Sequence, residues 1–290
     1  MNIQWYPGHM AKAKKMMQEN IKLVDLIIEL VDARVPYSSK NPDIDLLANN
    51  KTRIILLNKY DMADDKVSDE WKNHFEDKGY YVSFVNSKKG HGVKQVKELA
   101  YQACKEKIER NRKRGIINRP MRAMIVGIPN VGKSTFINSF VGRASAKTGN
   151  KPGVTKGKQW IRLKKNIELL DTPGILWPKF KEDFVGLHLA YIGSIKDEMI
   201  DILELSMKLI IFLSENYPKS LKKRYDVKLL DNIETLDDAI NILEEIAIER
   251  ACIKKGGEPD IDRAAKLLID DFRNVRLGKI SLESPDSILV

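Results

Sequence analysis

Cysteine and histidine are scarce in this chain of 290 residues, which has two cysteines and four histidines. Cys104 and Cys252 lie far apart, and neither has a partner at the spacing of a zinc or redox motif, so we expect no structural zinc site. No apolar run approaches the length of a membrane-spanning helix, and the start, MNIQWYPGHMAKAKKMM, lacks the apolar segment of a signal peptide. These absences lead us to expect a cytoplasmic protein with no membrane partner.

Strand-like and helix-like segments alternate through the first part of the chain. Continuous apolar runs such as DLIIELVDA (25–33) are typical of strands buried on both faces of a parallel sheet. The expected strands are 25–33, 53–57, 80–85, 122–127 and, as a pair joined at Lys165-Asn166, 160–171; the expected helices are 10–22, 43–50, 67–78, 92–110 and 133–141. This alternation predicts a doubly wound α/β sheet.

The pattern changes beyond Pro178. Helical periodicity appears at 197–213, 235–254 and 260–276, and the sequence from 179 onward has no convincing strand. We therefore expect two domains of ordinary size, a doubly wound α/β domain over 1–178 and a smaller all-α domain over 179–290.

A phosphate-binding motif opens at Gly127. GIPNVGKS (127–134) satisfies G-x-x-x-x-G-K-[ST], follows an expected strand and precedes an expected helix, which is the context of a P-loop. Backbone N–H groups of such a loop surround phosphates, Lys133 is expected to reach the β and γ oxygens, and Ser134 is expected to bind Mg²⁺ through its hydroxyl.

Two further elements suit a γ-phosphate and its metal ion. DTPG (171–174) ends an expected strand and matches D-x-x-G, so Asp171 is expected to hold Mg²⁺ through water and the Gly174 N–H to sense the γ-phosphate. Alone, Asp-Thr-Pro-Gly is also an ordinary turn sequence. Thr155, in KPGVTKG, is the candidate switch threonine for Mg²⁺ and the γ-phosphate, with a plain loop threonine as the alternative.

The stretch LLNKYD (56–61) matches the guanine-selecting pattern N-K-x-D. The Asp61 carboxylate can accept hydrogen bonds from guanine N1–H and N2–H₂, whereas adenine offers an acceptor at N1 and no 2-amino group. Asn58 is expected to bridge to guanine N7 and the P-loop, and the stem of Lys59 to cover the base. Alone, the pattern is also typical of a helix cap or turn. Asn86-Ser87-Lys88 then lies where a GTPase presents backbone N–H groups to guanine O6.

The order of these motifs is shifted. A conventional GTPase runs from the P-loop through the switch threonine and D-x-x-G to N-K-x-D and the last base loop, whereas this chain begins with N-K-x-D and ends with D-x-x-G. Because the cyclic order is intact, the chain is interpreted as a circularly permuted GTPase. The segment after DTPG then leads through ILWPKF into the helical part, and we expect the γ-phosphate to bias the orientation of that part.

Positive charge is concentrated around the P-loop. Residues 1–178 carry 33 Lys and Arg against 18 Asp and Glu, whereas 179–290 carry 17 against 22. Eight basic residues lie in 105–122 against two acids, and eight in 143–165 against none. One such cluster is typical of a solvated surface, but two clusters flanking a phosphate site favour RNA as a partner, and no DNA partner is expected.

The motifs together resemble those of the YlqF/RbgA family of circularly permuted GTPases that assist late assembly of the large ribosomal subunit. The resemblance covers essentially the whole chain and rests on WYPGHMAKA, DARVP, NKYD, GIPNVGKS, PGVT, DTPGILWP and the C-terminal GG…D…RAA…DFR…GKISLE. It implies GTP hydrolysis stimulated by the ribosomal particle, contacts with rRNA, and a C-terminal domain similar to the ANTAR RNA-binding fold. That domain is acidic overall here, so its RNA contacts would use local bases: Lys219, Lys222, Lys223 and Arg224.

The usual catalytic glutamine is absent. In Ras-like enzymes a glutamine directly after D-x-x-G orients the attacking water, whereas Ile175 stands at that place here, so we expect slow intrinsic turnover. His9 is the candidate replacement, because an imidazole can hold or deprotonate water and the resemblance implies that role. The alternative is a histidine that orders the N-terminal loop or touches RNA phosphate. For Asn130 the resemblance implies K⁺ coordination, and a loop-stabilising asparagine is the alternative.

We therefore predict a GTPase that binds an immature large ribosomal particle in its GTP form and leaves after hydrolysis. A GTP-gated RNA-binding switch or scaffold with negligible turnover stays open as the alternative, and an ATP-dependent nucleic-acid motor is disfavoured by Asp61. The residues expected to contact GTP are Asn58, Lys59, Tyr60, Asp61, Asn86, Ser87, Lys88, Asn130, Val131, Gly132, Lys133, Ser134, Thr135, Thr155 and Gly174.

Overall fold

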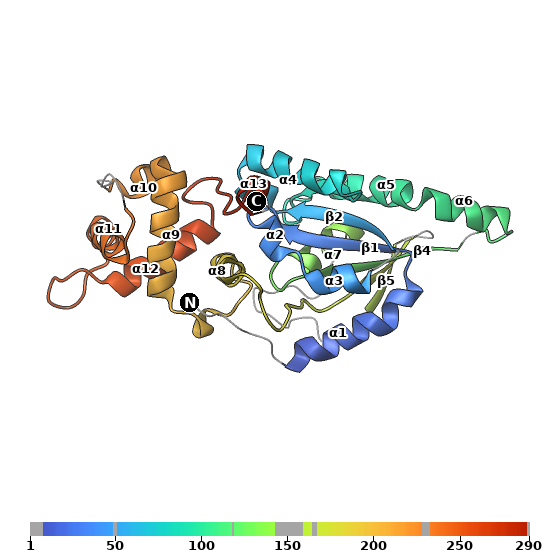
Figure 1. Ribbon diagram of the computed structural model, residues 1–290, viewed down its shortest axis with the longest axis horizontal. Coiled ribbons are helices and arrows are strands. Elements are labelled where there is room, and N and C mark those ends of the chain that lie inside the picture. Colours follow the sequence, from blue (N-terminus) through green and yellow to red (C-terminus); the bar gives the residue numbers. More distant parts are fainter. Residues whose placement is uncertain are drawn as a thin grey trace.

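A six-stranded sheet forms the centre of the computed structural model, which describes residues 8–48, 51–117, 119–142, 159–163, 167–227 and 233–288, apart from the side chains of His9, Gln159 and Leu163 (Figure 1). Its strands are β1 (Leu26–Asp32), β2 (Thr52–Asn58), β3 (Tyr81–Val85), β4 (Met121–Gly127), β5 (Gln159–Leu163) and β6 (Ile167–Asp171). They lie in the order β3-β2-β1-β4-β6-β5, and every pair is parallel except β5 with β6. The predicted doubly wound α/β fold is confirmed.

Helices cover both faces of this sheet. The apolar side chains of neighbouring strand positions separate into two clusters, since successive side chains of a strand point to opposite faces. Val31, Ile55 and Leu57 pack with Trp71 of α4, whereas Leu30, Ile54 and Leu56 belong to the cluster that contains α5. Burial on both faces explains why every residue of β1 is buried. The helices of this part are α1 (Gly8–Asn20), α2 (Pro36–Ser39), α3 (Pro42–Leu47), α4 (Asp65–Asp77), α5 (Val93–Ala103), α6 (Lys105–Lys113) and α7 (Lys133–Val141), with 3₁₀ turns at Ile21–Leu23 and Tyr60–Met62.

The single helix expected over 92–110 is in fact two helices, α5 and α6. Cys104 separates them with φ −103° and ψ 8°, outside the helical region, and its buried side chain fixes the joint against the core. The turn expected at Lys165-Asn166 lies outside the described residues, as do Thr155 and most of the basic stretch 143–165.

A group of helices follows the sheet. It consists of α8 (Asp183–Tyr191), α9 (Ile202–Asn216), α10 (Pro218–Tyr225), α11 (Leu236–Glu249) and α12 (Ile261–Arg273), with a 3₁₀ turn at Asp197–Met199. Figure 1 shows α9 to α12 gathered at one end of the molecule and α8 between them and the sheet. A capping box at Thr235 and Asp238 starts α11, and its buried stripe packs against α9 and α12. The expected helices at 235–254 and 260–276 are present with shorter bounds. The one expected at 197–213 is instead the 3₁₀ turn at Asp197–Met199 followed by α9, which extends to Asn216.

The last residues return to the sheet. After α12 the backbone N–H of Ile280 donates to Met62 O at 3.1 Å, and that of Leu282 donates to Arg34 O at 2.9 Å. Trp71 of α4 donates its indole N–H to the backbone oxygen of Glu283 at 2.9 Å, and α13 (Pro285–Ile288) packs on α4. The Tyr217 hydroxyl, between α9 and α10, also donates to Ser281 O at 3.2 Å. The final segment, 277–288, therefore contacts both the α/β part and the helical part that precedes it.

Among the helices that the structure describes, none has the length and apolar character needed to cross a membrane.

Candidate nucleotide-binding site

The expected phosphate loop joins β4 to α7 at the carboxyl end of the central strands, which is where open α/β sheets bind ligands. Two of its glycines are required by close approaches. A Cβ on Gly127 would lie 2.6 Å from Leu30 O, and one on Gly132 would lie 2.5 Å from Asn58 Nδ2. Both have positive φ, at 147° and 101°, where a side chain would be strained. Glycine is therefore required at both positions, because atoms of the neighbouring strands β1 and β2 lie too close for any side chain.

Lys133 folds back along this loop. Its Nζ donates to Ile128 O at 2.7 Å and to Gly127 O at 3.0 Å, and its side chain is buried. Burial lowers the pKa of Lys133 to about 8, and the Asp171 carboxylate opposes part of that shift. D-x-x-G lies against the same group, because a Cβ on Gly174 would be 2.8 Å from Lys133 Nζ. The structure thus brings GIPNVGKS and DTPG together, as the sequence predicted.

Asn58 ties the N-K-x-D loop to two other loops. Its Nδ2 donates to Val131 O in the P-loop at 2.6 Å, and its Oδ1 accepts from the backbone N–H and the hydroxyl of Ser87 at 3.1 and 2.8 Å. Asn58 is 1% exposed, so these bonds are shielded from water. The expected link from Asn58 to the P-loop is present, and it extends to the Asn86-Ser87-Lys88 loop.

The other base-site residues surround this junction. Lys59 has φ +60°, and the side chain of Asp61 is 31% exposed, with Lys89 Nζ 3.7 Å from its carboxylate. Tyr60 packs its ring against Phe84, with the ring centroids 5.9 Å apart. Asp61 is therefore accessible to a ligand while the residues beside it are fixed.

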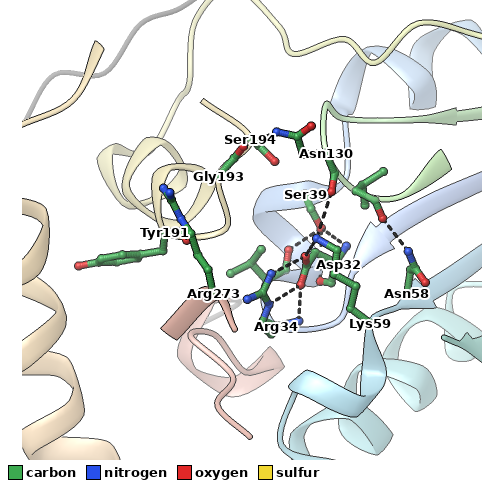
Figure 2. Close-up of polar contacts among 12 residues, drawn as sticks. Asp32, Arg34, Ser39, Asn58, Lys59, Asn130, Tyr191, Gly193, Ser194 and Arg273 are labelled. Atoms are coloured by element: carbon green, nitrogen blue, oxygen red, sulfur yellow. Dashed lines mark hydrogen bonds and ion pairs between the residues drawn. The ribbon is translucent and has the colours of Figure 1, made fainter. Parts of the chain in front are cut away.

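Asp32 is a residue of the candidate site to which the sequence analysis gave no role. Its buried carboxylate accepts two hydrogen bonds from the Arg34 guanidinium, both at 2.9 Å, and one from Lys59 Nζ at 2.8 Å (Figure 2). Burial alone would raise the pKa of Asp32, but the Arg34 and Lys59 cations hold it well below its usual range. The available signal was the DAR run directly after the strand Leu26–Asp32, since a charged residue ending a buried strand needs partners.

Lys59 also reaches the P-loop. Its Nζ donates to Asn130 O at 3.0 Å in addition to its bond with Asp32. Burial lowers the pKa of Lys59, although the Asp32 carboxylate acts in the opposite direction. The lysine expected to cover the base is thus oriented by a carboxylate and by the P-loop backbone.

Asn130 is held from the helical part of the chain. With φ +58°, it donates from Nδ2 to Gly193 O at 2.7 Å, and beside it Ser194 Oγ donates to Pro129 O at 2.8 Å. Gly193 and Ser194 follow α8, and nothing in the sequence pattern singled them out. This bond determines which end of the Asn130 amide is engaged, and it leaves Oδ1 as the end that a K⁺ ion could use.

The residues expected to hold Mg²⁺ carry suitable donor atoms. Asp171 ends β6 with a buried carboxylate, and Ser134 lies half-buried in the first turn of α7. Hydroxyl and carboxylate oxygens are the ligand types that Mg²⁺ prefers. Thr155, the third expected ligand, lies outside the described residues. Over the part of the chain that is described, no cluster of three or more His, Cys, Asp or Glu side chains could hold a metal ion.

The segment after DTPG is buried and apolar. Ile175 is 1% exposed, and its backbone oxygen accepts from Asn41 Nδ2 at 3.1 Å. The Leu176 N–H donates to Met10 Sδ at 3.5 Å, so the first turn of α1 lies against this segment. His9 belongs to that turn, but its side chain lies outside the described residues.

Family profiles and related sequences match this chain to GTPases, and a solved structure matches it to YlqF. A family profile described as "RsgA GTPase" matches residues 12–181, and one described as "50S ribosome-binding GTPase" matches residues 122–246. The protein named ribosome biogenesis GTPase A from Bacillus licheniformis is 46% identical over 288 residues, covering 99% of this chain and 100% of the relative, and that from Bacillus pumilus is 44% identical over 287 residues, with the same coverage. The crystal structure of GNP-bound YlqF from T. maritima is similar with a TM-score of 0.64 at 28% identity, covering 95% of this chain and 99% of that one.

Proposed function

The chain belongs to the ribosome biogenesis GTPase A family, and we propose that it hydrolyses GTP in the cytoplasm while assisting late maturation of the large ribosomal subunit. In this proposal it binds the immature particle in its GTP form and leaves after hydrolysis. The observation that carries the proposal is the bridge made by Asn58, which fastens a guanine-selecting loop to a P-loop from a distant part of the chain.

Each element of the site has a role in this proposal. The backbone N–H groups of 130–135 and the Lys133 ammonium bind the phosphates, and Asp61 accepts from the guanine N1–H and N2–H₂. Asn86-Ser87-Lys88 faces guanine O6, with Ser87 held by Asn58. Ser134, Asp171 and Thr155 would hold Mg²⁺, which neutralises charge on the phosphate oxygens when bound. Asn130 would hold K⁺ through its side-chain oxygen.

Intrinsic turnover is proposed to be slow. Ile175 stands where Ras-like enzymes place glutamine, and its buried aliphatic side chain can neither orient nor deprotonate water. We propose His9 as the residue that holds or deprotonates the attacking water. The contact between Met10 and Leu176 supports this, since it sets the helical turn that contains His9 beside the residues following DTPG.

The ribosomal particle is proposed to provide the stimulation. Four basic residues at the end of α6 are exposed: Arg110, Arg112, Lys113 and Arg114. Three lysines on α10 are exposed as well: Lys219, Lys222 and Lys223. Such bases are available to rRNA phosphates. Arg224 is not available in the same way, because its Nε donates to the buried Asp271 carboxylate at 2.6 Å. Of the four bases named for the helical part, the three lysines are therefore the more exposed and Arg224 is partly engaged.

A second candidate function is a GTP-gated RNA-binding switch with negligible turnover, which the buried Ile175 favours. GTP turnover in KCl, measured with and without purified large ribosomal subunits, separates the two. We expect strong stimulation by subunits, lost in His9→Ala with GTP binding intact and kept in His91→Ala, a matched exposed histidine. Salt-resistant binding to subunits without stimulation would favour the switch, and neither binding nor stimulation would refute the ribosomal partner.

A further inference from the structure

The C-terminal end of α12 reaches toward the nucleotide site through Arg273. Its Nε donates to Tyr191 O at 3.0 Å and its Nη2 donates to Ala190 O at 2.8 Å, so the guanidinium binds carbonyls of the last turn of α8. Both Nη atoms also pair with Asp197, at 2.9 and 2.8 Å. Carbonyls at a helix end need partners from outside the helix, and a planar guanidinium can bind several of them in a fixed geometry. Arg273 therefore sets the position of the α8 end.

The turn that follows α8 carries this position to the P-loop. A Cβ on Gly193 would lie 3.6 Å from the Arg273 guanidinium carbon, so the turn rests directly on that group. Gly193 O then accepts from Asn130 Nδ2, and Ser194 Oγ donates to Pro129 O. Figure 2 shows Arg273, Gly193, Ser194 and Asn130 following one another across the boundary between the helical part and the sheet. Only Ile192 separates Tyr191, whose backbone oxygen accepts from Arg273, from Gly193, whose backbone oxygen accepts from Asn130.

A second set of contacts reaches the same P-loop residue from the neighbouring position of α12. The Arg34 guanidinium lies over the Phe272 ring, 5.4 Å from its centroid. Arg34 is paired with Asp32, which binds Lys59 Nζ, and that Nζ also donates to Asn130 O. Asn130 is thus held at its side chain by the turn after α8 and at its backbone oxygen by the base-recognition loop.

We infer that Arg273 is a positioning residue for the P-loop, acting through the α8 turn on Asn130 and Pro129. The inference rests on the proposed binding of GTP at this site and goes beyond it by naming the contact through which the helical part and the nucleotide influence each other. Because such coupling is reciprocal, a helical part that holds the turn in place favours one P-loop geometry, and a nucleotide that changes the P-loop must in turn shift the helical part.

The first test compares Arg273→Lys with Arg276→Ala. Lysine keeps the charge at 273 but cannot bind two carbonyls and a carboxylate in one plane. Arg276 is a matched control, since it lies just beyond α12 and its partners within the described ranges are the carboxylates of Asp270 and Asp271. Dissociation constants are measured by fluorescence for labelled GDP and for a non-hydrolysable GTP analogue. We expect Arg273→Lys to weaken at least one of them by about fivefold or more and to change their ratio, and Arg276→Ala to stay within about twofold.

A second test separates action through the P-loop from a general loss of structure. In a chain carrying Asn130→Ala and Ser194→Ala, both hydrogen bonds between the turn and the P-loop are gone, so adding Arg273→Lys should change nucleotide affinity by less than about twofold. Thermal unfolding shows whether each variant is folded. If Arg273→Lys does not fold, Ser194→Ala alone takes its place as the test of the contact between the turn and the P-loop, since it removes only the bond to Pro129 O.

Equal effects of Arg273→Lys in the wild-type chain and in the doubly substituted chain would overturn the inference, as would a folded Arg273→Lys with unchanged affinities. The same titrations with adenine nucleotides test the proposed function separately. If the wild-type chain does not prefer guanine over adenine nucleotides, the proposed GTP binding is refuted. If it prefers guanine but its affinity is unchanged by Arg273→Lys, only the positioning role is refuted.

Discussion

Replacing Asn58 by alanine tests the bridge that unites the site. The amide of Asn58 makes three hydrogen bonds, to Val131 O at 2.6 Å, from the Ser87 N–H at 3.1 Å and from the Ser87 hydroxyl at 2.8 Å. Alanine removes all three, and the Val131 carbonyl and the Ser87 N–H lose a partner at a position from which water is excluded, since Asn58 is 1% exposed. A buried polar group without a hydrogen-bond partner destabilises the fold, because the free-energy cost of removing it from water is no longer offset.

The expected size of the loss follows from those bonds. Each contributes about 1 kcal/mol net, so the nucleotide-bound protein should lose about 3 kcal/mol of unfolding free energy. That loss divides between two measurable quantities. If the three loops stay ordered without nucleotide, the whole loss appears as a lower unfolding free energy of the free protein. If they do not, nucleotide binding must order them, and the loss appears as a GDP affinity lower by up to roughly 100-fold.

Urea unfolding with and without GDP, combined with fluorescence titration of labelled GDP, measures both parts. Asn216→Ala is the control, because Asn216 is exposed and its Nδ2 donates to Phe212 O, one turn earlier in α9, with no other partner among the residues that the structure describes. The control should stay within about 0.5 kcal/mol. If Asn58→Ala also stays within that limit in both measurements, the bridge does not stabilise the site and the reasoning is wrong.

Three further predictions concern single side chains. Because burial lowers the pKa of Lys133 to about 8 while phosphate favours the ammonium, GDP affinity should fall as the pH rises above about 8, and a pH-independent dissociation constant would contradict this. For the free protein the sign is opposite: the unfolded chain binds more protons between that pKa and the ordinary lysine value, so the Lys133 contribution to stability rises with pH across this window. Asp61→Asn should exchange the preference for guanine for one for xanthine, whose 2-oxo group accepts from the new amide, by about 100-fold or more in competition titrations. Glu283→Ala should cost roughly 2–4 kcal/mol of unfolding free energy in urea, since the buried carboxylate binds Ser38 N at 2.9 Å and His188 Nδ1 at 3.0 Å, and a loss below about 0.5 kcal/mol would refute an anchoring role.

The central strands of the sheet were predictable because they are buried on both faces. Runs such as LIIELVD and TRIILLN contain few side chains that tolerate water, and continuous apolar segments of that length are strands in α/β proteins. Helix ends were less predictable. The break at Cys104 depends on a local change in backbone angles, and no glycine or proline stands there to indicate it in the sequence.

The candidate site was predictable as a set of motifs. The spacing of GIPNVGKS, DTPG and NKYD identifies the chemistry, and the cyclic order of the motifs, which is a property of the chain alone, identifies the permutation. The link from Asn58 to the P-loop also followed from the pattern, and the structure contains it. Guanine contacts, the roles of Thr155 and His9, and K⁺ binding at Asn130 stay predictions.

Only the tertiary structure decided which distant residues support these motifs. Asp32 orients Lys59 from another strand, Gly193 binds Asn130 from beyond α8, Arg273 holds that turn from α12, and Glu283 fastens the end of the chain to α2. Sequence spacing fixes the chemistry of a motif because its residues are neighbours along the chain. It leaves these contacts open, because a helix end meets a particular loop only as the whole sheet and all the helices pack together.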